Sequence, residues 1–138
     1  MSLTKNEAAE AIAVYVKAWE TQDPDLIVTI FTPAATYHER VLAEPIPDRE
    51  AIRDYWQEKV VRSQANIRCD LLSLYLDGKT VIAEWEAEFD DVAQGVRKRM
   101  REIAVLVFDG RRIASLREYW ASETIPALAE MFSERLAG

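Results

Sequence analysis

The sequence feature that most constrains the fold is a set of apolar residues spaced two apart between residues 81 and 89. The set consists of Val81, Ala83, Trp85, Ala87 and Phe89, and from Ala83 onward it alternates with three glutamates. A period of two is typical of a β-strand with one buried face and one solvated face. Ala93-Gln94-Gly95 then supplies a turn, so the pattern predicts a hairpin whose second strand begins near Arg97.

The two strands of this hairpin carry opposite charges on one face. Folding about the turn pairs an acidic residue with an arginine at three levels, namely Asp90 with Arg97, Glu88 with Arg99, and Glu86 with Arg101. Such pairs contribute about 0.2–1 kcal/mol each. Their main effect is to fix the register, because a slip of one residue would turn every side chain to the other face. The same register predicts that Trp85 lies beside Glu102 on the inner face.

Helical patterns precede the hairpin. Thr4 and Glu7 form a capping box, and the helix that follows has a buried stripe made of Ala8, Ile12, Tyr15 and Trp19. Asp23-Pro24 opens a short second helix that Pro33 should end, and residues 35–39 follow as a short strand. A third helix begins at Asp48, and its apolar face consists of Ile52, Tyr55, Trp56 and Val60.

Residues 67–120 are predicted to be strands throughout. Helices followed by strands indicate an α+β fold, and a chain of 138 residues suits a single domain, residues 1–138. A net charge of −7 argues against nucleic-acid and anionic membrane partners. No run reaches the roughly 20 apolar residues of a membrane span, and the first residues lack the regions of a signal peptide. We therefore expect a cytoplasmic protein.

Few residues in the chain suit a metal or a phosphate. One cysteine, Cys69, and one histidine, His38, allow neither an internal disulfide nor a Cys/His zinc site. The four glycines form no phosphate-binding loop. We expect no metal and no cofactor. Strand alternation should turn His38 away from the side of its neighbour Glu39.

The hairpin at Asp109-Gly110 has two alternative registers. A two-residue loop would place Glu102 across from Arg117. A three-residue loop, with Gly110 in a left-handed conformation, would place Glu102 across from Glu118 instead. Turn propensity alone does not decide between them.

Apolar residues also predict a patch on the outer face of the sheet. The patch should contain Leu72, Leu74 and Leu76 together with Ile103, Val105 and Val107. A contiguous apolar patch usually marks a partner surface, and a homodimer through the sheet face is the simplest hypothesis. A last helix, with Pro126 in its first turn, should present Ile125, Leu128 and Phe132 to the sheet, the pocket mouth or a partner subunit.

Several short motifs carry a resemblance to a known family. They are Tyr15-Val16, Asp23-Pro24-Asp25, Ile30-Phe31, Ala35-Thr36-Tyr37, Ala51-Ile52-Arg53-Asp54-Tyr55-Trp56, Val107-Phe108-Asp109-Gly110 and Arg117-Glu118-Tyr119-Trp120. Their order and spacing resemble the nuclear-transport-factor-2-like superfamily, which includes the SnoaL-like polyketide cyclases and the ketosteroid isomerases. The resemblance implies a curled antiparallel β-sheet packed on N-terminal helices, forming a cone with an internal pocket for a small molecule.

The resemblance also implies roles for individual residues. Tyr15 stands where the ketosteroid isomerases keep an oxyanion-donating tyrosine, and Glu39 where they keep a carboxylate base. Trp56 replaces a tyrosine of their hydrogen-bond network. Ala104 stands in place of a protonated aspartic acid, so half of the oxyanion hole would be absent. The alignment favours the three-residue loop, which turns inward Met100, Glu102, Ala104, Leu116, Glu118 and Trp120.

The predicted site therefore mixes carboxylates with aromatic walls. Its catalytic candidates are Tyr15, Glu39, Glu102 and Glu118, and its ligand-binding candidates are Trp19, Tyr37, Tyr55, Trp56, Trp85, Met100 and Trp120. The aromatic residues could instead be plain core. If Glu102 and Glu118 face each other, burial and like charge should raise one pKa and create an acid–base pair. Otherwise each pairs with an arginine or reaches solvent.

Three functions fit these residues. The first is a cofactor-free isomerase or cyclase that acts on a small, partly apolar carbonyl compound, with Glu39 as base and Tyr15 as oxyanion donor. The second is a ligand-binding module without catalysis, which Ala104 suggests. The third is an interaction domain that works through its apolar sheet face.

Overall fold

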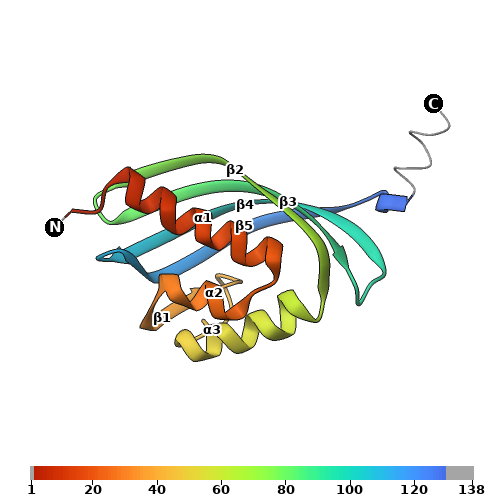
Figure 1. Cartoon of the computed structure of the whole chain (residues 1–138), viewed down its shortest axis with the longest axis horizontal. Helices are drawn as coiled ribbons and strands as arrows, with labels where there is room; N and C mark the ends of the chain where they lie inside the picture. The colour runs from red at the N-terminus through yellow and green to blue at the C-terminus, as the bar shows by residue number, and fades with distance from the viewer. Residues whose placement is uncertain (1, 130–138) are drawn as a thin grey trace.

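The computed structural model describes residues 2–129. Its helices are α1 (Lys5–Thr21), α2 (Pro24–Ile27) and α3 (Arg49–Trp56), and its strands are β1 (Phe31–His38), β2 (Gln64–Asp77), β3 (Thr80–Asp91), β4 (Val96–Asp109) and β5 (Arg112–Ile125). The strands form one sheet in the order β1-β5-β4-β3-β2. The helices lie on one face of this sheet, which curls over them without closing (Figure 1). The predicted α+β fold is confirmed.

The predicted helix starts are confirmed by their caps. The Thr4 hydroxyl accepts a hydrogen bond from the Glu7 N–H at 3.1 Å, and the Glu7 carboxylate accepts one from the Thr4 N–H at 2.9 Å. Asp23 caps α2, and Asp48 caps α3 by accepting from the Ala51 N–H at 2.8 Å. These bonds satisfy N–H groups that have no partner inside the helix.

The third helix ends in an unusual turn. After Trp56 the chain continues as a π-helix over Gln57–Val61, where the Arg62 N–H donates to the Gln57 carbonyl five residues back at 3.2 Å. Single π-turns of this kind often occur at functional sites. Val60, which lies in this turn, is buried.

The first strand differs from the prediction at its start. A 3₁₀ turn, Val28–Ile30, ends the helical segment, so β1 already begins at Phe31 and Pro33 lies within the strand. Proline is tolerated there because β1 is at the edge of the sheet. The strand pairs in parallel with β5, whereas β2 to β5 form an antiparallel meander.

The charged register between β3 and β4 is confirmed. Asp90, Glu88 and Glu86 stand opposite Arg97, Arg99 and Arg101, and Trp85 stands opposite Glu102. Arg101 contacts Glu86 at 2.9 Å and Glu84 at 3.2 Å, and Arg97 contacts Asp90 at 3.1 Å. Glu88 and Arg99, although opposite in register, form ion pairs with Arg68 and Glu123 instead.

Both predicted registers of the Asp109-Gly110 hairpin are wrong. Asp109 pairs with Arg112, and one extra residue, Ala114, then bulges out of β5. Glu102 therefore lies opposite Trp120, and Ala104 lies opposite Glu118. The register differs from the three-residue loop by two positions. An even shift preserves facing, so Glu118 and Trp120 still share the inner face with Glu102.

A second bulge changes the outer face. Leu71 pairs with Trp85 and Ser73 with Glu84, so Leu72 is an extra residue that reverses the facing of the rest of β2. Leu74 and Leu76 consequently pack against the core, and their predicted place on the outer face is wrong. The outer apolar patch is instead made of Tyr75, Ile82, Ile103, Val105 and Tyr119.

The predicted final helix starts later than expected. Strand β5 extends to Ile125, which therefore does not lie on a helix face. Leu128 is helical, and Phe132 lies outside the described residues. No helix within residues 2–129 is long and apolar enough to cross a membrane.

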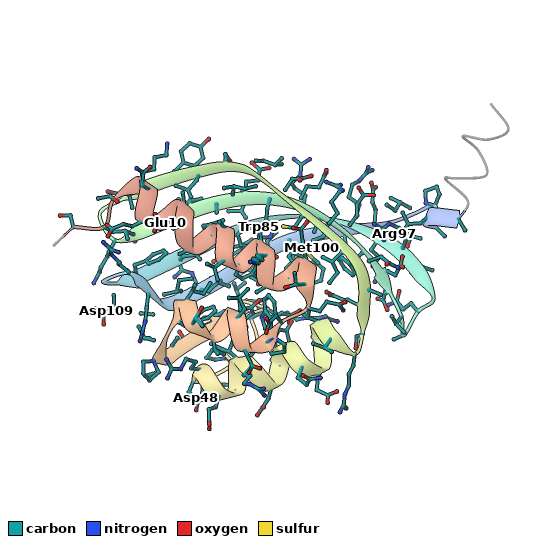
Figure 2. All side chains as sticks on the ribbon, viewed as in Figure 1. Glu10, Asp48, Trp85, Arg97, Met100 and Asp109 are labelled. Atoms are coloured by element: carbon teal, nitrogen blue, oxygen red, sulfur yellow. The ribbon has the colours of Figure 1, made fainter. Side chains whose placement is uncertain are left out.

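The core lies between the helices and the inner face of the sheet. Trp85 on β3 and Met100 on β4 mark neighbouring strands of that face in Figure 2. Its largest fully buried side chains include Trp56, Trp85, Phe31, Ile12, Ile52 and Leu116. Burial of such side chains stabilises the fold by roughly 1.5–3 kcal/mol each, and it also surrounds the inward carboxyl groups with apolar material.

Candidate functional site

All the predicted site residues except Trp85 line one cavity of about 50 Å³ between the helices and the sheet. The cavity has room for a few atoms or water molecules. It adjoins an outer cleft of about 250 Å³, and the two share Glu39, Lys59, Gln64, Met100 and Trp120. The cavity and the cleft together form the candidate site.

Glu118 is held by two tyrosines. The Tyr15 hydroxyl donates to Glu118 Oε1 at 3.0 Å, and the Tyr37 hydroxyl donates to the same oxygen. The two hydroxyl oxygens lie 3.1 Å apart. Burial raises the pKa of Glu118 to about 7, although the two tyrosine hydrogen bonds act in the opposite direction. Burial and the charge of Glu118 in turn raise the pKa of Tyr15 and of Tyr37 well above the usual value.

Glu102 is the more strongly perturbed carboxyl group. Its side chain is only 2% exposed, and burial raises its pKa well above the usual value, with the charges of Glu118 and Glu39 adding to the effect. Burial therefore favours the uncharged carboxylic acid form of Glu102, which can donate a proton or a hydrogen bond. Its Oε2 atom is buried and has no hydrogen-bond partner among the described residues.

Glu39 lies at the mouth of the cavity, just after β1. Its side chain is 23% exposed and forms a salt bridge with Arg40 at 3.3 Å. The Glu39 carbonyl accepts a hydrogen bond from Trp120 Nε1 at 3.2 Å, and the Arg40 guanidinium lies 5.8 Å from the centre of the Trp120 ring. These contacts hold a charged carboxylate next to an aromatic ring at the entrance.

The aromatic residues form the cavity wall by packing on one another. Tyr15 meets the edge of Trp56 at 5.5 Å between ring centres, and Tyr37 packs on Tyr55 at 5.5 Å. Trp85 lies behind this wall, stacked on Tyr15 at 4.8 Å. It therefore supports the site without lining it.

Three further residues line the cavity: Lys59, Val60 and Gln64. Val60 was recognisable, because it belongs to the apolar face of the third helix. Gln64 belongs to no pattern that the sequence analysis recognised. In the structure it is buried, and its side-chain oxygen accepts a hydrogen bond from Trp19 Nε1 at 2.8 Å. His38, as expected, is not among the lining residues. No group of three or more histidine, cysteine, aspartate or glutamate side chains within residues 2–129 is arranged to hold a metal.

Cross-strand pairing places a carboxyl group opposite Ala104, the position at which the resemblance implied an aspartic acid. Glu118 stands directly across from Ala104 and lines the cavity. Glu102 is two residues before Ala104 on the same face of β4. Two carboxyl groups thus occupy the region in which the resemblance implied an aspartic acid. The Tyr15 hydroxyl, for which the resemblance implied an oxyanion-donating role, donates to Glu118 in this structure.

Comparison with solved structures shows the same fold in several proteins. A hypothetical protein with a ketosteroid isomerase-like fold from Catenulispora acidiphila, in complex with trimethylamine, has a TM-score of 0.71 and 20% identity, over 80% of this chain and 84% of that chain. The epoxide hydrolase/cyclase-like enzyme SalBIII, described for pyran ring formation in salinomycin, has a TM-score of 0.76 and 24% identity over 88% and 98%.

An LEH-like epoxide hydrolase from M. tuberculosis has a TM-score of 0.70 and 18% identity, over 96% of this chain and 92% of that chain. At such identities the likeness concerns the fold alone. No curated protein matches the sequence. The model of the SnoaL-like domain family matches residues 12–116, which is most of the chain and runs from within α1 to within β5. This chain therefore belongs to the SnoaL-like domain family.

Proposed function

We propose that this chain is a cofactor-free acid–base enzyme that acts on a small, partly apolar carbonyl compound as an isomerase or a cyclase. The observation that carries the proposal is the buried Glu102, whose pKa burial raises, in the wall of a cavity whose mouth holds the salt-bridged Glu39. A proton donor and a proton acceptor in one site are the requirement for this chemistry.

In the proposed reaction the substrate carbonyl lies near Glu102, with its α-carbon toward Glu39. The Glu39 carboxylate removes the α-proton, and the electron pair moves into the carbonyl, whose oxygen accepts a hydrogen bond or a proton from Glu102. Glu39 then returns the proton to another carbon, which completes an isomerisation. In a cyclase the carbon nucleophile attacks a second carbonyl of the same molecule, and the new alkoxide takes the proton.

Glu118 has a supporting role in this scheme. Its charge adds to the burial that raises the pKa of Glu102. Its Oε1 atom already accepts from Tyr15 and Tyr37, so it is less available to a substrate than Glu39 is. We infer that Glu118 and the two tyrosines are positioning residues.

The test does not depend on the identity of the product. Small ketones and enones are incubated with the protein in D₂O, and loss of the α-proton signal is followed by proton NMR. A positioned acid or base contributes typically 10²–10⁴-fold, so Glu39→Gln should slow exchange at least about 100-fold, and Glu102→Gln should also slow it. Glu10→Gln, on the exposed face of α1 (Figure 2), is the matched control. Unchanged exchange in Glu39→Gln would remove Glu39 as the base.

A second candidate reaction is the opening of an epoxide. The specific observation is again the buried Glu102, because a carboxyl group whose pKa is raised by burial can protonate an epoxide oxygen while a carboxylate activates water or a hydroxyl group. Two proteins of similar fold are described as epoxide hydrolase-like. Small epoxides therefore belong in the same panel, with diol or cyclic ether as the product. Binding without exchange or ring opening across the panel would favour a non-catalytic ligand-binding module.

We also propose that two copies of the chain associate through the outer apolar patch. Its exposed members Tyr75, Ile82, Ile103 and Tyr119 are 41–63% exposed on the open face of the sheet, and patches of this kind usually mark partner surfaces. Ile103→Lys should convert a dimer to a monomer in light scattering after size exclusion. A wild-type monomer at micromolar concentration would refute the proposal.

A further inference from the structure

Lys59 is a cation that lines both parts of the candidate site, the inner cavity and the outer cleft. Within residues 2–129 it is the only lysine or arginine in the lining of the cavity. Its side chain is open to solvent and forms no ion pair in that range, although Glu39, Glu102 and Glu118 line the same cavity. An accessible ammonium group thus lies where the cavity meets the cleft.

The other cations of the outer cleft already have carboxylate partners. Arg40 contacts Glu39 at 3.3 Å, and Lys98 contacts Asp91 at 3.2 Å. The second pair is sheltered, since its side chains are only 20% and 15% exposed. The charge of Lys59 therefore has no carboxylate of its own in the cleft.

The cleft consequently has an excess of positive charge. Its charged side chains are three cations and two carboxylates, namely Arg40, Lys59, Lys98, Glu39 and Asp91. The chain as a whole has a net charge of −7. The sign of the charge is thus reversed in this cleft, and such a local potential attracts an anion.

The position of Lys59 depends on the π-turn that follows α3. Lys59 is the third residue of this turn, Gln57–Val61, and its neighbour Val60 is buried and lines the cavity. π-turns occur frequently at functional sites. The buried neighbour fixes the backbone of Lys59 at the site, which distinguishes it from a lysine on an open surface.

We propose that Lys59 is a specificity-determining residue that binds a carboxylate group of the substrate in the outer cleft. The inference rests on the proposed acid–base function and deepens it, because it narrows the substrate from a carbonyl compound to an oxo acid. Phe89, Met100 and Trp120 line the same cleft and suit the apolar body of such a molecule.

The charges also orient the substrate. A carboxylate in the inner cavity would lie next to three carboxyl groups, where little water screens the repulsion. The uncharged carbonyl end therefore enters the cavity of about 50 Å³, and the carboxylate stays in the cleft of about 250 Å³. Together these volumes approach the lower end of the roughly 300–1,000 Å³ that small-molecule sites occupy.

Other charged groups fit the cleft less well. An ammonium group would be repelled by the excess positive charge. A phosphate group has up to two negative charges, so one of them would lack a partner. A single carboxylate balances the excess.

The direct test compares an acid with its uncharged amide. Cyclohexanecarboxylate and cyclohexanecarboxamide are titrated into the protein by calorimetry, and the wild type should bind the acid at least about tenfold more tightly, as expected for one charge-assisted hydrogen bond. Lys59→Met keeps the length of the side chain without its charge and should abolish this preference, whereas Lys59→Arg should retain it. Lys79→Met is the matched control, because Lys79 is an exposed lysine that lines neither the cavity nor the cleft.

A kinetic test separates binding from catalysis. The substrate is 4-oxocyclohexanecarboxylate in D₂O, with exchange followed by proton NMR. Lys59→Met should raise KM about tenfold and leave kcat nearly unchanged, because the carboxylate is remote from the reacting carbon. Exchange of cyclohexanone, which has no carboxylate, should be the same in both proteins.

The wild type also gives an answer without any variant. Its preference for the acid over the amide should shrink in about 0.5 M NaCl, because salt screens a pair in an open cleft. The inference is overturned if the wild type binds no cyclohexanecarboxylate, binds acid and amide equally, or shows a preference that Lys59→Met retains. Failure of the proposed function looks different, since unchanged exchange in Glu39→Gln would leave the binding of these unreactive probes intact.

Discussion

The pKa of a glutamate side chain shifts in opposite directions on the two faces of this sheet. On the outer face, the guanidinium of Arg101 lowers the pKa of Glu86. On the inner face, burial raises the pKa of Glu102, which directly follows Arg101 in the chain. Adjacent residues of one strand thus contribute to a solvated charge ladder and to a water-excluded acid. The comparison shows that facing, which a strand fixes through its register, decides the chemistry of a glutamate.

The difference comes from the partners on each face. Outer carboxylates such as Glu84 and Glu86 share Arg101, in contact with water. The inner pair, Glu102 and Glu118, has tyrosine hydroxyls, indole rings and another carboxyl group around it. Neither inner carboxyl group forms an ion pair within residues 2–129, so burial favours the uncharged form of both.

The largest expected effect is the loss of stability when a buried side chain of the inner face is truncated, compared with the truncation of an exposed side chain of the outer face. Trp85→Ala removes a fully buried indole and should lower the free energy of unfolding by about 3–5 kcal/mol. Ile82→Ala, three positions earlier and 41% exposed, should cost far less in dilute protein. Urea unfolding followed by circular dichroism measures both. Equal losses would mean that the inner face is not the packed one.

A smaller effect is expected in the pH dependence of stability. Burial raises the pKa of Glu118 from 4.5 to about 7, so between these values the folded state holds a proton that the unfolded state releases. Stability should therefore fall as the pH rises from 4.5 to 7, by on the order of 3 kcal/mol for this group. Glu118→Gln, which cannot titrate, should flatten that decline in urea unfolding at several pH values. A variant with the wild-type slope would contradict the assignment.

The smallest effect should come from the outer ladder. Glu86→Gln removes a carboxylate whose pKa is lowered, so its contribution is present at neutral pH and is lost as the pH falls below 4.5, opposite in sign to Glu118. The loss of stability should be slight in low salt and should vanish near 0.5 M NaCl, because solvated pairs are screened at about that concentration. A loss of stability that persists in high salt would contradict the interpretation of Glu86 as a member of a solvated ion pair.

Much of the fold could be predicted because its strongest signals are periodic and local. The alternation around Trp85 and the short turn at Gly95 fix one register without reference to the rest of the chain. Bulges have no such signal. Leu72 and Ala114 each add one residue to a strand, and nothing in their composition distinguishes them from ordinary strand residues. The outer patch and the last hairpin were therefore predicted incorrectly in part.

The site was predictable in its residues more than in its contacts. The sequence predicted that Glu102 and Glu118 face inward. This prediction holds because the register error was two positions, and an even shift leaves each side chain on the same face of the sheet. The donation of both tyrosines to one oxygen of Glu118 depends on the distance between α1, β1 and β5. The place of Lys59 beside both the cavity and the cleft depends on a π-turn, and no sequence pattern predicted that turn.

The π-helix at Gln57–Val61 gives the site a simple route of change. One residue fewer in this turn would restore an ordinary α-helix, and the residues after it would rotate by about 100° relative to α3. Lys59 and Val60, which line the cavity, would then be replaced there by their neighbours. A single-codon deletion or insertion could thus reshape the lining while the sheet, with its acids, stayed as it is. Evolution could vary the lining of the cavity in this way without rebuilding the sheet wall that holds the carboxyl groups.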